Sequence, residues 1–131
     1  MQGRVTAEAL TEPLQALAAS RLPSLAPSQV PVIASALATL NVHSRPLAAA
    51  VASAAAPAVP VADSNHLSLL VWFFAKADYV DASLMAVADA RLAVLLEEKS
   101  MRSMDLARHL WSLAQLGHWP PSDVRFSPDW Q

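Results

Sequence analysis

The sequence predicts an all-α protein, an α-solenoid of about two and a half antiparallel helix-hairpin repeats of 37–39 residues. Two observations carry this prediction. Three segments align with one another at offsets of 37 and then 39 residues, and each has apolar residues at the three- and four-residue spacing of a helix. In addition, each segment ends on a residue type that tolerates a left-handed backbone. No segment alternates long enough to predict a sheet, and we expect the hairpins to stack with a right-handed twist.

The three aligned segments begin at Ser28, Asn65 and Met104, and each is expected to form the first helix of a hairpin. Matched positions hold Val30, Leu67 and Leu106; Leu37, Phe74 and Leu113; Ala38, Ala75 and Ala114; and Trp72 with Trp111. His109 is the exception, because it aligns with the apolar Ile33 and Leu70. In the third segment the apolar face is expected to run through Leu106, Leu110, Leu113, Ala114 and Gly117.

Residues at both ends of these segments are typical of helix boundaries. Ser64 and Ser103 are expected to be N-caps, and Asp105 adds a favourable negative charge to a first turn. The residues after the last apolar position are of the types that best tolerate the left-handed conformation that ends a helix. They are Asn41, Asp78 and Gly117.

A second helix is expected after each first helix. The ranges are 45–56, then 82–98 capped by Asp81, and a third that would start at Pro121. An additional helix at 6–22, interrupted by Pro13, fits the second helix of a preceding repeat. We therefore divide the chain into an N-terminal helix and linker (1–26), a helical-repeat domain (27–124) and an irregular tail (125–131). The face of the helix at 82–98 is expected to hold Leu84, Ala88, Leu92 and Leu95.

Composition excludes several classes of protein. Apolar residues make up 54% and charged residues 15%, which is the reverse of a disordered chain. Two glycines cannot form a Gly-rich phosphate loop, and the lack of cysteine excludes disulfides and thiolate metal sites. The four histidines lack metal-binding spacing, and no nucleophile motif is present, so we expect no enzyme activity, cofactor, metal or small-molecule substrate. The apolar stretch at 46–62 is too short for a membrane span and contains Pro57 and Pro60.

One repeat resembles a known family. Residues 110–117 read LWSLAQLG, with weaker versions in VWFFAKAD at 71–78 and ASALATLN at 34–41, and Pro120–Pro121 follow the best copy. This pattern resembles the octotricopeptide repeat, and is similar to the repeats of FAST-kinase-like proteins of animal mitochondria. The resemblance implies RNA binding in a mitochondrion or chloroplast. The implied partners are RNA, or protein subunits of a large organellar assembly such as the ribosome.

The net charge of the chain and the distribution of its basic residues affect the expectation of RNA binding. The net charge is −2, which counts against autonomous nucleic-acid binding, although residues 99–125 carry four basic and two acidic residues. If RNA is bound, cations would contact phosphates and an amide could contact a base. The alternative is a solvated surface, in which Arg108 pairs with Asp105. The RNA-contact candidates are Lys76, Arg102, Arg108, His109 and Gln115.

Aromatic and apolar residues suggest a second functional class. Trp72 and Trp111 could stack on bases, but their repeat equivalence favours a place in the core between helices. Leu69 and Phe73 lie off the main apolar face, so their helix is either central and covered or part of a protein interface. The alternative function is therefore a structural adaptor that binds proteins in a large complex without contacting RNA.

Overall fold

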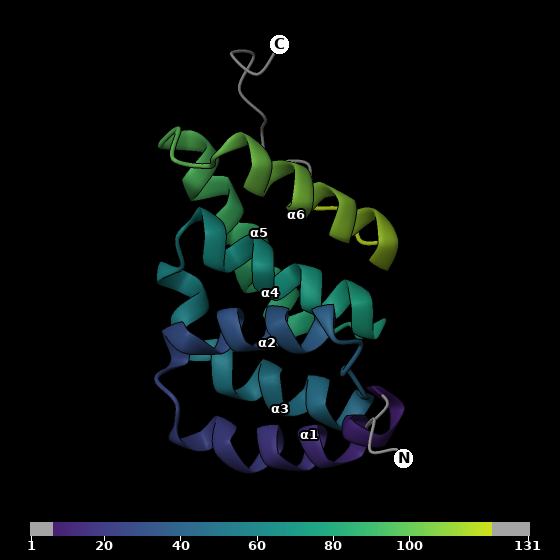
Figure 1. Cartoon of the computed structure of the whole chain (residues 1–131). Helices are drawn as coiled ribbons and strands as arrows, with labels where there is room; N and C mark the ends of the chain where they lie inside the picture. Colours follow the sequence, from purple (N-terminus) through teal and green to yellow (C-terminus); the bar gives the residue numbers. More distant parts are fainter. Residues whose placement is uncertain (1–6, 122–131) are drawn as a thin grey trace.

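The computed structural model describes residues 7–121, with side chains from residue 11 onward, and this part of the chain contains only helices and connecting turns (Figure 1). The predicted all-α class is confirmed. Three short 3-10 helices, Leu22–Ser24, Pro27–Gln29 and Ala56–Val61, join longer helices. The α-helices are α1 (Ala7–Arg21), α2 (Val30–Thr39), α3 (Arg45–Ala55), α4 (Ser64–Ala77), α5 (Ala82–Glu97) and α6 (Ser103–Leu116).

The three repeated segments form α2, α4 and α6, and these helices pack on one another in that order. The most extensive contacts between helices are those of α4 with α6 and of α2 with α4, so α4 lies in the middle of the row (Figure 1). Among the remaining helices, α3 packs on both α2 and α4, and α5 packs on α4. In addition, α1 packs on α3, and α5 packs on the 3-10 helix that follows α3.

The core follows from the central place of α4. Phe73 and Leu67 have no exposed surface, and Leu70, Val71 and Phe74 are almost fully buried. A helix that is covered on several sides needs apolar residues around most of its circumference, which explains why α4 is not apolar along a single stripe. The predicted face of α5 is also buried. It consists of Leu84, Ala88, Leu92 and Leu95.

The first helices end as predicted. Asn41, Asp78 and Gly117 all have positive φ, at 61°, 50° and 65°. In each case the following N–H donates to a carbonyl five residues earlier, which satisfies a carbonyl at the helix end. These bonds are Val42 N to Leu37 O at 2.8 Å, Tyr79 N to Phe74 O at 3.0 Å and His118 N to Leu113 O at 3.0 Å. The end of α5 has the same geometry at Lys99, with φ 58°, which no sequence signal indicated because lysine is not a typical left-handed residue.

Two predicted N-caps are wrong by one residue. The N-cap of α4 is Asp63, whose Oδ1 accepts a hydrogen bond from the His66 N–H at 2.8 Å. The N-cap of α6 is Arg102, which has no side-chain cap of its own. Ser64 and Ser103 are instead the first helical residues. Asp81 caps α5 as predicted, through a 3.0 Å bond from the Leu84 N–H.

Other boundaries agree closely with the sequence. The helix expected at 6–22 is α1, which runs through Pro13 without a break. The helix expected at 45–56 ends at Ala55, and the Pro-rich linker after it is the 3-10 helix Ala56–Val61 rather than irregular chain. The second helix expected to start at Pro121 lies outside the described residues.

Gly117 offers a test of the helix ends. A Cβ added there meets nothing within 4 Å, so the cost of Gly117→Ala comes from the backbone conformation alone. We expect Gly117→Ala to lower the free energy of unfolding by about 1 kcal/mol, as measured by urea denaturation. Gly117→Asn is the control and should lose less, because Asn41 adopts the same conformation in the first repeat. Equal stabilities of the Ala variant and the parent chain would contradict this interpretation.

Candidate interaction surface

A buried carboxylate joins α6 to α4. Asp105 is almost fully buried, and its Oδ2 accepts from the Ser64 hydroxyl at 2.6 Å and from Arg102 Nε at 3.2 Å. Its other oxygen, Oδ1, accepts from Arg108 Nη1 at 3.3 Å. The pairing of Arg108 with Asp105 expected from their spacing is therefore confirmed. A buried carboxylate is tolerated only when donors surround it, and here two guanidinium groups and a hydroxyl do so.

Two serines of α4 complete this cluster. The Ser64 hydroxyl accepts a hydrogen bond from the Arg102 backbone N–H at 3.0 Å, so a residue of α4 satisfies the N-cap of α6. Ser68 Oγ accepts from Arg108 Nη1 at 2.9 Å. Arg102 and Arg108 therefore share one acidic partner, Asp105. The net charge of these three side chains is about +1, which is less than the two free guanidinium groups would offer to a phosphate backbone.

His109 is not a surface residue. Its side chain has no exposed surface, and it occupies the core position that its alignment with Leu70 predicts. Burial, and secondarily the nearby charge of His118, lowers the pKa of His109 from 6.5 to about 4. Neither ring nitrogen has a hydrogen-bond partner among the described residues. The prediction of an RNA contact at His109 is wrong, because a neutral, fully buried imidazole reaches no phosphate.

The outer surface of the row carries two tryptophans and two polar residues. Trp72 and Lys76 are half-buried on α4, with Lys76 Nζ 5.9 Å from the centroid of the Trp72 ring. Trp111 and Gln115 occupy the equivalent positions on α6 and are exposed. The expectation that Trp111 lies in the core is wrong, because no described helix packs on that side of α6. Trp72 is partly covered, in agreement with its central helix.

The two candidates for a protein interface behave differently. Phe73 is fully buried, so the interpretation of α4 as a central, covered helix holds for it and it offers no surface to a partner. Leu69 is half-buried and keeps some exposed surface. Phe73 follows Ser64 by nine residues, which is about two and a half helical turns. Because Ser64 contacts α6, Phe73 lies on the opposite side of α4, toward α2.

An exposed apolar face runs along α6. Met104 is 77% exposed, Trp111 47% and Leu110 40%, and Ala107 and Ala114 lie between them. We call the surface formed by these five residues the α6 outer face. The face predicted to be buried included Leu110 and Ala114, and this part of the prediction is wrong. The residues that α6 buries are Asp105, Leu106, His109, Ser112 and Leu113.

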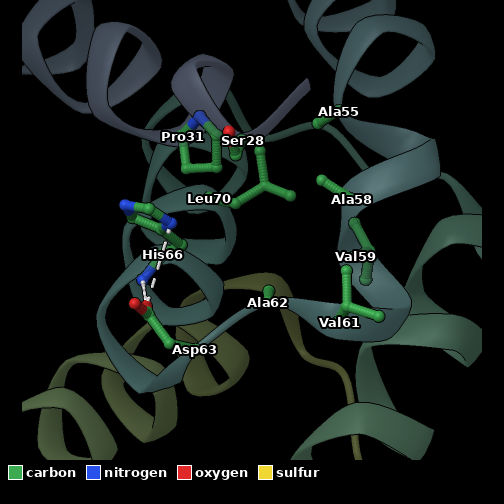
Figure 2. Close-up of a pocket in the computed structure, with 10 residues that line it drawn as sticks. All are labelled: Ser28, Pro31, Ala55, Ala58, Val59, Val61, Ala62, Asp63, His66 and Leu70. Atoms are coloured by element: carbon green, nitrogen blue, oxygen red, sulfur yellow. Dashed lines mark hydrogen bonds and ion pairs between the residues drawn. The ribbon is translucent and has the colours of Figure 1, made fainter. Parts of the chain in front are cut away.

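A small cavity lies between α2, α4 and the 3-10 helix Ala56–Val61 (Figure 2). Its volume is about 140 Å³, well below the roughly 300–1,000 Å³ of ligand pockets. Its walls are mostly alanine, valine and proline side chains, with the capping pair Asp63 and His66 at one side (Figure 2). The cavity can hold a few atoms, which is too little space for a substrate.

A second hollow, of about 300 Å³, lies beside α5 and is lined mainly by alanine. At its wall His118 Nε2 lies 2.8 Å from Asp89 Oδ2, and Asp89 is nearly fully buried. This pair joins the end of α6 to α5. No serine, threonine or cysteine of the described chain lines the hollow, so the imidazole–carboxylate pair has no nucleophile to activate among these residues.

Two kinds of site are absent from residues 7–121. No three or more His, Asp or Glu side chains lie close enough together to hold a metal ion. No described helix is long and apolar enough to cross a bilayer.

Comparisons with models of protein families, with curated proteins and with solved structures found no match. The resemblance to octotricopeptide repeats therefore stays a prediction.

The cap that α4 provides to α6 can be tested at Ser64. In Ser64→Ala the Arg102 N–H loses its acceptor and Asp105 loses a donor. We expect the free energy of unfolding to fall by about 1–3 kcal/mol, measured by urea denaturation. Ser83→Ala, at an exposed position of α5, is the matched control and should change stability little. A loss no larger than that of the control would show that the cluster does not hold α6.

Acid stability tests His109. In the unfolded chain, the imidazole of His109 has its ordinary pKa of 6.5, whereas burial in the folded chain lowers this pKa to about 4. Because the unfolded chain binds this proton more readily, the free energy of unfolding is unaffected by His109 above pH 6.5. It then falls by roughly 3 kcal/mol as the pH drops from 6.5 to about 4. We expect His109→Leu to remove this loss, and His43→Leu to retain it, in urea titrations at several pH values. Identical acid profiles of His109→Leu and the parent chain would contradict the assignment.

Proposed function

We propose that this chain is a non-enzymatic helical-repeat module, a short α-solenoid, that acts as an adaptor by binding protein through the α6 outer face. The observation that carries the proposal is the exposure of Ala107, Leu110 and Ala114 in this face, because the equivalent positions on α2 and α4 are buried or half-buried. Apolar side chains gathered on one exposed helix face are typical of a protein-binding surface.

The equivalence is specific. Each first helix has a face of mainly small residues directed away from the preceding helix, and α2 and α4 bury this face against the next helix in the row. The third face has the same character, but no described helix covers it. The three sets are Pro31, Ala34 and Ala38 on α2; Ser68, Val71 and Ala75 on α4; and Ala107, Leu110 and Ala114 on α6.

Electrostatics favours a protein partner over RNA. The chain has a net charge of −2, Arg102 and Arg108 share Asp105, and His109 is neutral. Affinity for a phosphate backbone depends on cations that can replace condensed counterions. Of the five RNA-contact candidates, His109 is inaccessible, Lys76 and Arg108 are half-buried, and Arg102 and the uncharged Gln115 are exposed, but both arginines are paired with Asp105.

One arrangement favours RNA as the second candidate function. Trp72 and Trp111 stand at equivalent positions on neighbouring helices, with Lys76 and Gln115 one turn further along each helix. Aromatic rings next to a cation and an amide suit the stacking and phosphate contacts of a single strand. Organellar RNA metabolism, an organellar ribonucleoprotein and a location in a mitochondrion or chloroplast are proposed only with this second candidate, from the resemblance.

The two functions differ in their response to substitution. We expect Leu110→Asp to abolish co-purification of a specific protein, identified by mass spectrometry, from the source organism. Val94→Asp should retain it, because Val94 is 39% exposed on α5, close to the 40% of Leu110. The captured protein must then bind the purified chain directly. Retention of that protein by Leu110→Asp would overturn the adaptor proposal.

RNA binding is measured on the same purified chain. For an adaptor we expect no saturable binding of single-stranded RNA in a filter assay at low salt. Saturable binding that weakens as salt rises, and that drops in Lys76→Ala, would instead support the second candidate.

A further inference from the structure

We infer that the α6 outer face binds a second copy of this chain, head to tail, by packing on the exposed outer side of α2. This inference rests on the proposed function, since it names the partner of the same face. It depends on a second apolar face at the other end of the helix row, which no described helix covers and which corresponds, in the repeat register, to the surface that such a face contacts.

The exposed side of α2 is mainly apolar, and Thr39 is the polar residue exposed beside it. Leu40 is 57% exposed and Val32 48% exposed, and Ala36 and Ile33 lie beside them. We call the surface formed by these four residues the α2 outer face. Pro31, which is buried, precedes Leu40 by nine residues, about two and a half turns, so Leu40 lies on the side of α2 opposite the α4 contact.

The repeat register shows what this face is built to contact. At an offset of 37 residues, Ile33, Ala36 and Leu40 correspond to Leu70, Phe73 and Ala77 of α4. Those α4 residues lie on the side that packs on α2, and Phe73 is fully buried there. The α2 outer face is therefore equivalent to the side of α4 that packs on the small-residue face of α2.

The α6 outer face is the matching half. Ala107, Leu110 and Ala114 correspond to Ser68, Val71 and Ala75 at an offset of 39 residues, and α4 uses those positions toward α6. Asp105 and Ala114 are nine residues apart, so Ala114 lies opposite the contact with α4. Packing the α6 outer face of one copy on the α2 outer face of another therefore continues a contact that the chain already makes twice.

The junction is chemically compatible. Neither outer face contains a charged residue, so their packing buries no carboxylate. In this respect it differs from the contact of α4 with α6, which buries Asp105. Gln29, at the edge of the α2 outer face, already uses its Oε1 to accept a hydrogen bond from the Ala26 N–H at 3.0 Å. The larger Leu40 and Ile33 meet Ala107 and Ala114, just as the large side chains of α4 face the small-residue side of α2.

The contacts of α1, α3 and α5 support the same arrangement. Within the described residues, α1 packs on α3 as α5 packs on the segment after α3, whereas α6 is not followed by a partner helix. Docking places α6 of one copy beside α1 of the next. Leu17, which is exposed on α1, is available to this contact. The contact is heterologous and leaves both outer ends free, so it predicts open chains rather than a closed dimer.

The experiment measures the mass of the 131-residue chain by light scattering and sedimentation over a range of concentrations. We expect the parent chain to form dimers and longer species as concentration rises. Leu110→Asp and Leu40→Asp should each weaken self-association by about 100-fold, because either would bury an unpaired carboxylate. Both sites are exposed, so we expect the variants to fold, and circular dichroism and thermal melts are the measurements that check this. Val94→Asp is the control and should associate like the parent chain.

Mixing the two variants tests the polarity of the contact. Leu40→Asp retains an intact α6 outer face, and Leu110→Asp retains an intact α2 outer face, so an equimolar mixture should form a 1:1 heterodimer and nothing larger. A parent chain that is monomeric at all concentrations would overturn the inference. So would a closed dimer that survives in Leu40→Asp, since that result shows α6 pairing with α6. If the parent chain is monomeric but Leu110→Asp still loses its protein partner, only this inference fails and the adaptor function stands.

Discussion

The contact between successive first helices is the constraint on which the rest of this structure depends. The middle helix, α4, has to pack on α2 with one side and on α6 with the other, so its apolar residues surround it. Each contact joins a face of small residues to a face of larger ones, which lets the helices approach closely. On α6, no described helix covers Ala107, Leu110 and Ala114, and on α2 none covers Ile33, Ala36 and Leu40. The adaptor proposal starts from the first of these surfaces, and the proposed self-association starts from both.

The two contacts along the row are not chemically alike. Between α2 and α4 the buried positions are apolar, whereas the contact of α4 with α6 encloses Asp105, Ser64 and Ser68. A buried carboxylate contributes little net stability, but its donors have to be in fixed places, so it favours one register of α6 on α4 over others. This also bears on function, because the guanidinium groups that RNA would need are held by an internal carboxylate.

Several parts of the candidate site could be predicted from sequence and several could not. The spacing of Asp105 and Arg108 indicated their ion pair, because it depends on helix geometry alone. The burial of His109 was visible in its alignment with Leu70, yet its polarity suggested a surface role. The exposure of Trp111 could not be derived, since an apolar residue at a core-like position is buried only if another helix covers it. Ser64 was identified as a cap but assigned to its own helix rather than to α6.

Local chemistry in the sequence was sufficient for the helical class, the positions of the helices and the left-handed residues that end α2, α4 and α6. These features depend on contacts within a few residues, such as backbone hydrogen bonds and the tolerance of Asn41, Asp78 and Gly117 for positive φ. Which side of each helix is covered was settled by the arrangement of the helices in space. Burial depends on the neighbours that a residue acquires from distant parts of the chain, and for Phe73 and Leu110 those neighbours differ although both lie on apolar helices of the same row.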